Sequence, residues 1–346
     1  MQQKGLVVLA AAAFFSASLA GYAVLHGDRA VSSAPPGARA LPGLAQKLPE
    51  IASIALFRAD LKADFLRRGK GWAVAEKAGY PADPGKIGKL ALALADLQLV
   101  EPKTRRPDRY PRLDVEKPGA GKATLVTVKG KSGATLARLI VGRQRYDRLG
   151  TGKNGVYVRK PGDPQSWLAR GSLDLSGKLP DWLDRKILDV RQAQVARVSL
   201  TAPDGTKLAI ARPSPDAPFG IVDAPAGAKF KSQDEIAAPA GALQSLDLQD
   251  VAPAAKLPPP ATGSWLASYD TFDGLEVKLT LFDRDKEPWI AVAASGAGKA
   301  AAEAKEIEGR VSGWSYRIPS YKAMPLKKKL ADLLVPPPPA PPAAKK

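Results

Sequence analysis

Few side chains in this 346-residue sequence are suited to nucleophilic or metal chemistry. The chain has no cysteine, and its single histidine, His26, flanks an apolar run, where an interfacial position explains it. Thiol catalysis, disulfides, histidine-based triads and zinc sites with Cys or His ligands are therefore excluded. We expect no catalytic residue, no metal site, no cofactor and no enzymatic activity.

The remaining candidates for acid–base chemistry are two carboxylate pairs. Asp181 and Asp184 flank a tryptophan, and Asp270 and Asp273 lie close to two aromatic residues. Glycosidases use such an acid and base beside the sugar, so a carbohydrate-active enzyme stays open as a minor alternative. A position at a helix N-terminus explains Asp181 equally well.

Positive charge dominates the chain, with a formal net charge of +18. Residues 101–160 contain 16 Lys or Arg against 5 Asp or Glu, and the densest part is interleaved with prolines. This pattern fits a solvated irregular loop or a docking surface for an anionic partner. The candidate docking residues are Arg105, Arg106, Arg109 and Arg112.

An uncharged apolar run covers residues 5–25. As a helix it would be about 30 Å long, which matches the hydrocarbon core of a bilayer. Lys4 favours a cytoplasmic amino terminus, so the run predicts a membrane anchor with the bulk of the chain in the periplasm. Cleavage of a signal peptide near Ala20 is the alternative, and it would leave a soluble periplasmic protein.

Two halves of the chain repeat each other. Strand-like alternation at 51–56 recurs at 195–200, and an apolar helical pattern recurs at a constant offset of 149 residues. The paired apolar positions are Ile87, Leu90, Leu94, Leu97 and Leu99 against Ile236, Pro239, Leu243, Leu246 and Leu248.

The first of these helices has a capping residue at Asp83 and a proline in its first turn. In the second, Pro239 replaces Leu90, so we expect that helix to be kinked or to start later. A last helix is expected at 325–334. β-Type segments follow each helix, at 124–129, 135–141 and 155–159 and at 275–281, 289–293 and 314–318. The patterns predict an α+β fold: an N-terminal transmembrane helix followed by two tandem, internally duplicated modules with antiparallel sheets.

This organisation implies six segments. They are an anchor or signal segment at 1–29, a Pro/Gly/Ser tether at 30–46, a first module at 47–175, a connecting helix at 176–194, a second module at 195–334 and a Pro-rich basic tail at 335–346.

Several short motifs resemble the family called domain of unknown function 4340. They are Leu139-Ile-Val-Gly142, Gly155-Val-Tyr-Val-Arg159, Trp182-Leu183 with Ile187-Leu188, and Val195-Ala-Arg-Val198. The resemblance implies a single-pass bacterial envelope protein, similar to auxiliary components of gliding-type ABC transporters, and it supplies no catalytic residues.

The expected function is that of a non-enzymatic scaffold or accessory subunit of an ABC-type transport or envelope complex in the bacterial inner membrane. Its partners would be the membrane, through residues 5–25, and ABC transporter subunits, with no role for nucleic acid. A binding module for an anionic envelope polymer or lipid headgroup is the alternative.

Overall fold

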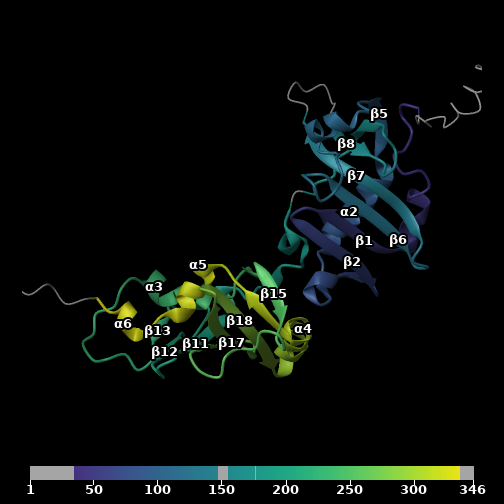
Figure 1. The fold of residues 1–346 in the computed structure, drawn as a ribbon. Helices are drawn as coiled ribbons and strands as arrows, with labels where there is room; N and C mark the ends of the chain where they lie inside the picture. Colours follow the sequence, from purple (N-terminus) through teal and green to yellow (C-terminus); the bar gives the residue numbers. More distant parts are fainter. Residues whose placement is uncertain (1–34, 147–154, 176, 336–346) are drawn as a thin grey trace, which may run out of the picture. The chain divides into compact units, whose positions relative to one another are not determined.

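The computed structural model describes residues 35–146, 155–175 and 177–335 (Figure 1). The predicted anchor at 5–25 and the predicted Pro-rich tail from residue 336 onward lie outside these residues. Within the described part, no helix is long and apolar enough to cross a membrane.

Nine strands from the first half of the chain form one sheet. They are β1 (Ile51–Arg58), β2 (Leu61–Arg68), β3 (Gly71–Val74), β4 (Tyr80–Pro81), β5 (Gln98–Pro102), β6 (Thr124–Gly130), β7 (Thr135–Arg145), β8 (Gly155–Arg159) and β9 (Ser166–Arg170). Their order is β4-β3-β2-β1-β6-β7-β8-β9-β5.

Eight strands from the second half form another sheet. They are β11 (Val195–Thr201), β12 (Lys207–Ala211), β13 (Gly220–Ile221), β15 (Asp250–Pro253), β16 (Trp265–Thr271), β17 (Leu275–Arg284), β18 (Glu287–Gly296) and β19 (Trp314–Arg317). Their order is β13-β12-β11-β16-β17-β18-β19-β15. A small sheet pairs β10 (Lys186–Leu188) with β14 (Leu246–Asp247).

The two large sheets share one connectivity. In each, an antiparallel hairpin lies beside a run of four consecutive strands, and the strand that precedes this run closes the edge. The internal repeat seen in the sequence is therefore also present in the strand order.

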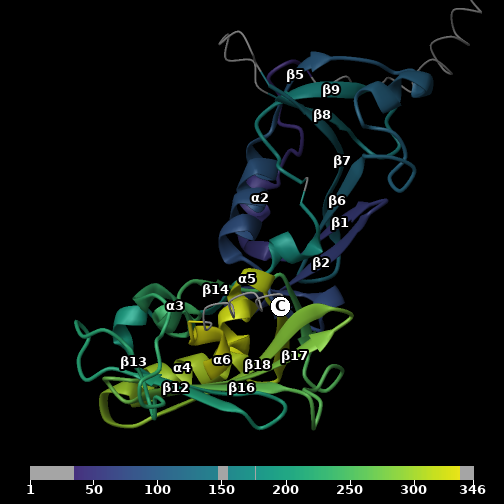
Figure 2. The same ribbon diagram turned by 90° about the vertical axis from the view of Figure 1, so that its left-hand side faces the viewer.

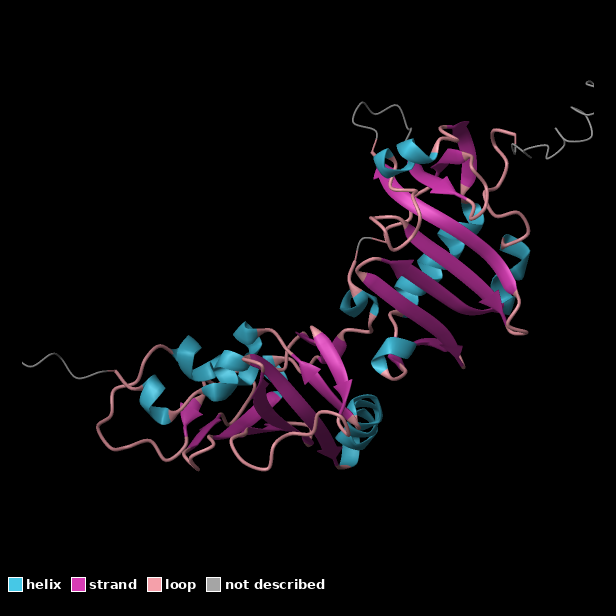
Figure 3. Ribbon diagram, in the orientation of Figure 1, coloured by secondary structure: helices cyan, strands magenta, loops and turns pink. Residues whose placement is uncertain are grey.

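The predicted fold class, α+β with a transmembrane helix, is wrong. Figure 3 shows that strands dominate the described residues and that the helices are short. Alternating apolar residues favour strands over most of the chain, and Pro239 interrupts one helix, since an interior proline removes a helical hydrogen bond and clashes with the preceding turn. Only α2 (Pro84–Asp96) has the predicted length, and Asp83 caps it by accepting hydrogen bonds from the N–H groups of Gly85 and Lys86.

Three other predicted helices are shorter than expected or divided. The connecting helix is a 3₁₀ turn, η4 (Leu179–Trp182), followed by β10. The second-half helix is interrupted next to Pro239, as the sequence predicts: α3 (Gln233–Ala237) ends and η6 (Ala238–Gly241) follows. The helix expected at 325–334 is divided into η8 (Met324–Lys327) and α6 (Leu330–Leu333), and α5 (Ser320–Ala323) precedes it.

One helix was not predicted. α4 (Ala301–Val311) buries Ala304, Ile307 and Val311, a helical spacing that is readable in the sequence. The remaining short turns are η1 (Ala45–Glu50), η2 (Ala75–Lys77), η3 (Pro107–Arg112), η5 (Gln192–Gln194) and η7 (Gly298–Ala300).

The chain groups into two compact units. Unit 1 contains Met1–Pro49, Leu92–Val126 and Ala137–Leu173, and unit 2 contains Glu50–Ala91, Thr127–Leu136 and Asp174–Lys346. The module boundaries inferred from the repeat remain a prediction. In unit 1, residues of the expected tether hydrogen-bond to β5: the N–H groups of Gly37 and Ala40 donate to the carbonyls of Leu99 and Leu97.

The core of unit 2 follows strict strand alternation. Leu275, Val277, Leu279 and Leu281 of β17 are buried, while Lys278 points to solvent, as the sequence pattern predicts. Helical segments α3, α5 and α6 lie on one side of this sheet (Figure 2). The Tyr269 hydroxyl, fully buried, donates to the Pro239 carbonyl of η6 at 2.9 Å.

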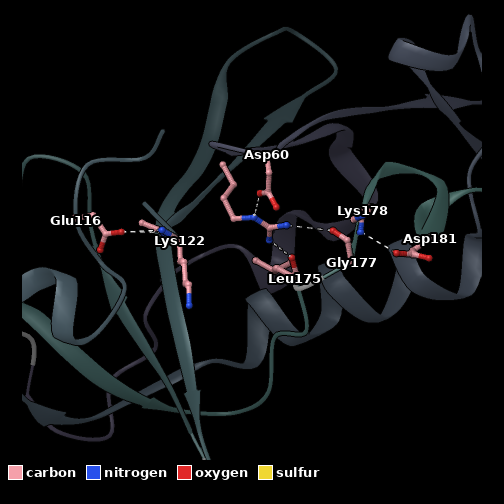
Figure 4. Close-up of polar contacts among 9 residues, drawn as sticks. Asp60, Glu116, Lys122, Leu175, Gly177, Lys178 and Asp181 are labelled. Carbon is pink, nitrogen blue, oxygen red and sulfur yellow. Dashed lines mark hydrogen bonds and ion pairs between the residues drawn. The ribbon is translucent and has the colours of Figure 1, made fainter. Parts of the chain in front are cut away.

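Arginine side chains attach irregular segments of unit 2 to its strands. Arg58 at the end of β1 donates to the carbonyls of Leu175 and Gly177 at 2.5 and 3.3 Å, and its Nε lies 2.5 Å from Asp60 (Figure 4). The hydrogen bond from Arg58 lowers the pKa of the exposed Asp60 carboxyl.

Three consecutive lysines fix the C-terminal segment of unit 2. Lys327 pairs with Asp283 at 2.7 Å, Lys328 with Glu235 at 3.5 Å and Lys329 with Asp204 at 2.5 Å. Two backbone hydrogen bonds hold the same segment: the N–H of Lys231 donates to the Leu333 carbonyl, and the N–H of Val335 donates to the Lys229 carbonyl. The hydrogen bond from Lys329 lowers the pKa of Asp204.

The pKa of Asp204 is depressed in the folded chain, so its ion pair with Lys329 stabilises the fold above the ordinary aspartate pKa of about 4. This stabilisation is lost as the pH falls below that value. We predict that acidification lowers the protection of the Lys231 and Val335 amide protons, measured as the ratio of the intrinsic to the observed exchange rate. Asp204→Asn should speed their exchange about twofold to fivefold at neutral pH, since the pair is exposed, and should flatten the pH dependence. Hydrogen exchange followed by NMR measures both effects.

Asp216→Asn is the matched control, because Asp216 is exposed and forms no ion pair in the described part of the chain. Equal exchange in the wild type, Asp204→Asn and Asp216→Asn proteins would contradict the prediction.

Candidate anion-binding surface

The four arginines singled out in the sequence lie on one turn of unit 1. Arg105 and Arg106 precede η3, and Arg109 and Arg112 belong to it; all four side chains are exposed. We call these four residues the basic platform.

The segment that carries the platform is anchored at its start by β9. The buried Ser166 hydroxyl donates to the Thr104 carbonyl at 2.8 Å, and the N–H of Ser166 donates to the same oxygen at 2.9 Å. The N–H of Lys103 donates to the Ser166 carbonyl at 2.9 Å. Arg105 therefore directly follows two residues, Lys103 and Thr104, that are hydrogen-bonded to β9.

Tyr110 anchors the middle of the platform. Its side chain is buried, and its hydroxyl donates to the Pro164 carbonyl at 2.7 Å and to the Arg105 carbonyl at 3.3 Å. The guanidinium of Arg159 lies 4.5 Å from the centre of the Tyr110 ring, a cation–π contact. Tyr110 thus turns inward where its arginine neighbours turn outward.

The underside of the platform is a small apolar cluster. Tyr110 packs with Val115, Ala123 and Ile140, and partly buried Leu113, Leu125 and Tyr157 surround them. Arg159 closes one side of the cluster, because its Nε donates to the Val115 carbonyl at 2.9 Å and its Nη1 to the Asp163 carbonyl at 3.3 Å.

Gly142 of β7 allows the segment after the platform to approach the sheet. A Cβ atom at this position would lie 2.8 Å from the Asp114 carbonyl oxygen and closer still to that of Leu113. The N–H of Arg143 donates to the Leu113 carbonyl at 3.2 Å. No other residue type fits at position 142 without moving this backbone.

The following loop is closed by a carboxylate. Glu116 accepts hydrogen bonds from the N–H groups of Lys122 and Ala123 at 2.9 and 3.3 Å (Figure 4). This loop brings two more cations, Lys117 and Lys122, to the same segment.

The charges of the platform are only partly neutralised. Arg106 forms an ion pair with Asp108 at 3.0 Å, and its hydrogen bond lowers the pKa of that exposed carboxyl. Among the residues that the structure describes, Arg105, Arg109 and Arg112 have no carboxylate partner. Three arginine side chains on an ordered turn are therefore available to an anion.

Three of the four candidate carboxylates accept local hydrogen bonds. Asp181 accepts from the N–H of Lys178 at 2.8 Å (Figure 4), Asp184 from the N–H of Lys186 at 3.4 Å, and Asp273 from the Thr271 hydroxyl. In the described residues, no three His, Cys, Asp or Glu side chains are grouped in a way that would hold a metal ion.

Sequence reasoning found the arginines but missed the residues that order them. Ile140 and Gly142 belong to one of the motifs quoted above, and Tyr157 and Arg159 belong to another. These motifs therefore build the support of the platform in unit 1.

We predict that Gly142→Ala destabilises the protein by about 1–3 kcal/mol, because the added methyl group has to displace backbone. Exchange of the Leu113 and Val115 amide protons should become faster in the same variant. Denaturant unfolding and hydrogen exchange measure the two effects.

Gly88→Ala is the control, since Gly88 lies in α2 and an alanine methyl group there would have no atom within 4 Å. It should stabilise the protein by about 0.5–1 kcal/mol. An unchanged stability of Gly142→Ala would refute the close approach.

A family model described as domain of unknown function (DUF4340) matches residues 72–262, a segment that includes the whole basic platform. No curated protein and no solved structure matches the chain. The family match covers more than half of the sequence and confirms the resemblance seen in the short motifs. The chain belongs to the DUF4340 family.

Proposed function

We propose that the protein is a non-enzymatic binding protein that holds an anionic partner through the basic platform. The observation that carries this proposal is the ordered presentation of Arg105, Arg109 and Arg112 without carboxylate partners in the described residues. Ordering the backbone beforehand lowers the entropy that binding costs. A freely solvated basic loop would not have the buried tyrosine and the closely approached glycine beneath it.

The partner class that suits this surface is an anionic polymer or the headgroups of an anionic lipid. Arginine side chains spread along an exposed turn provide several weak, screened contacts rather than one enclosed site. A periplasmic location, with export directed by the apolar segment at 5–25, would place the platform among such partners.

A second candidate function is that of an accessory subunit of an ABC-type transport complex. Membership of the family supports it, through the similarity of some members to auxiliary transporter components. In this case the platform would contact an acidic surface of a transporter subunit.

For the first candidate, we predict that binding to phosphatidylglycerol vesicles or to dextran sulfate weakens steeply with salt. Replacing Arg105, Arg109 and Arg112 together by Gln should weaken binding about tenfold or more at low ionic strength, since each contact contributes modestly. The salt dependence should become shallower. Sedimentation with vesicles and affinity measurements over a salt series give these quantities.

The matched control replaces Lys62, Arg68 and Lys70 by Gln, because these side chains are exposed and the change in net charge is the same. If both triple variants lose affinity equally, net charge alone explains the binding and the platform has no special role.

For the second candidate, full-length protein extracted from membranes in mild detergent should co-purify with ABC transporter membrane subunits. An exported protein of similar basic charge serves as the control. Recovery of the protein by itself from the extract, after crosslinking, would count against this candidate.

A further inference from the structure

Unit 2 contains a cavity that the proposed function does not use. Its volume is about 390 Å³, and it opens beside β11 and β12, with further walls from Ile221, Val222 and Leu330. Pockets for small molecules begin at roughly this size, about 300 Å³. β12, β13 and α6, the elements that contain Lys207, Ile221 and Leu330, are labelled in Figures 1 and 2.

Two hydroxyl groups form the floor of the cavity. Ser199 and Thr201 lie two residues apart on β11, so their side chains emerge on the same face of the sheet. Both residues are half-buried, and neither hydroxyl has a hydrogen-bond partner among the described residues. Both hydroxyls are therefore free to donate to a ligand oxygen.

The register of the hairpin leaves room above this floor. Ala209 of β12 is opposite Ser199, and Lys207 is opposite Thr201. The small side chain of Ala209 leaves the Ser199 hydroxyl accessible, while Lys207 brings an amino group to the adjacent position.

Two cations and one carboxylate line the cavity. Arg197 and Lys207 line it, and neither forms an ion pair in the described part of the chain. Two carboxylates face this region: Asp223 on the wall and Asp270, which is opposite Arg197 in the ladder between β11 and β16. Neither carboxylate lies within ion-pair distance of the two cations, so both cations can turn toward a ligand.

The remaining wall is apolar and fixed. Leu330 follows Lys329, whose ion pair with Asp204 measures 2.5 Å, and Leu334 forms a β-bridge with Phe230 farther along the segment. Ile221 and Val222 come from β13 and the residue after it. The cavity thus combines cations and hydroxyls on one side with aliphatic side chains on the other.

We propose that this cavity binds a small organic anion, a carboxylate or a phosphate monoester with a short aliphatic part. Arg197 and Lys207 hold the anionic group, and the hydroxyls of Ser199 and Thr201 donate hydrogen bonds to it. The aliphatic part packs against Val222 and Leu330. The site lies wholly within unit 2 and does not depend on the basic platform.

Methyl NMR of the full chain tests the proposal with four probes: butyrate, butyl phosphate, inorganic phosphate and butanol. Butyrate or butyl phosphate should cause saturable shifts of the Val222 and Leu330 methyl signals, and the comparison of the two tells which anionic group is preferred. Butanol and inorganic phosphate should each bind at least about tenfold more weakly, since each lacks one half of the interaction.

Arg197→Gln and Lys207→Gln should each weaken binding of the better probe about tenfold or more. Lys256→Gln, an exposed lysine that does not line the cavity, is the charge-matched control and should bind normally. The triple arginine variant of the basic platform should also bind normally, which separates this site from the proposed function.

Two outcomes would overturn the proposal. One is the absence of saturable shifts with both organic anions. The other is equal binding of butanol and the anions, or equal loss in Lys256→Gln and Arg197→Gln, because the charged wall would then have no specific role.

Discussion

Hydrogen bonds from arginine guanidinium groups to backbone carbonyls hold the irregular parts of this protein on its sheets. A chain with 31 glycines and 32 prolines has many segments that cannot satisfy their own backbone groups. Arg58 donates to the carbonyls of Leu175 and Gly177, and Arg159 donates to those of Val115 and Asp163. Arg212 donates to three carbonyls, those of Val195, Gln192 and Pro215. The planar guanidinium suits this role, because its five donors are directed to several acceptors at once.

This use of arginine divides the positive charge of the chain into two kinds. Arg159 and Arg212 bond to carbonyls and also lie over aromatic rings, Tyr110 at 4.5 Å and Phe219 at 4.4 Å. Lys327, Lys328 and Lys329 are paired with carboxylates. These cations stabilise the fold, whereas the platform arginines other than Arg106 and the cations at the unit 2 cavity lack carboxylate partners in the described residues. The paired cations are therefore committed to the fold, and the unpaired ones are the candidates for contact with partners.

The strands were largely predictable, and the helices were not. Alternation at 275–281 and the cap at Asp83 depend on neighbours in the sequence, so the pattern predicts β17 and the start of α2 correctly. Apolar periodicity also predicted helices from Leu179 and Leu326, but only short turns form there, whereas the interruption expected at Pro239 is present. Periodicity shows which side chains are buried, while backbone hydrogen bonding decides which structure buries them.

The sequence by itself determined the repeat, the family and the cluster Arg105, Arg106, Arg109 and Arg112, because these depend on residue identity and spacing. It left open whether that cluster is a loose loop or an ordered surface. Tertiary structure decided this, through the Tyr110 hydroxyl that reaches Pro164, 54 residues away, and the close approach of Leu113 to Gly142. The sequence did not predict the cavity beside Ser199 either. The register that places Ala209 opposite Ser199, and the segment that brings Leu330 to the cavity, arise only on folding.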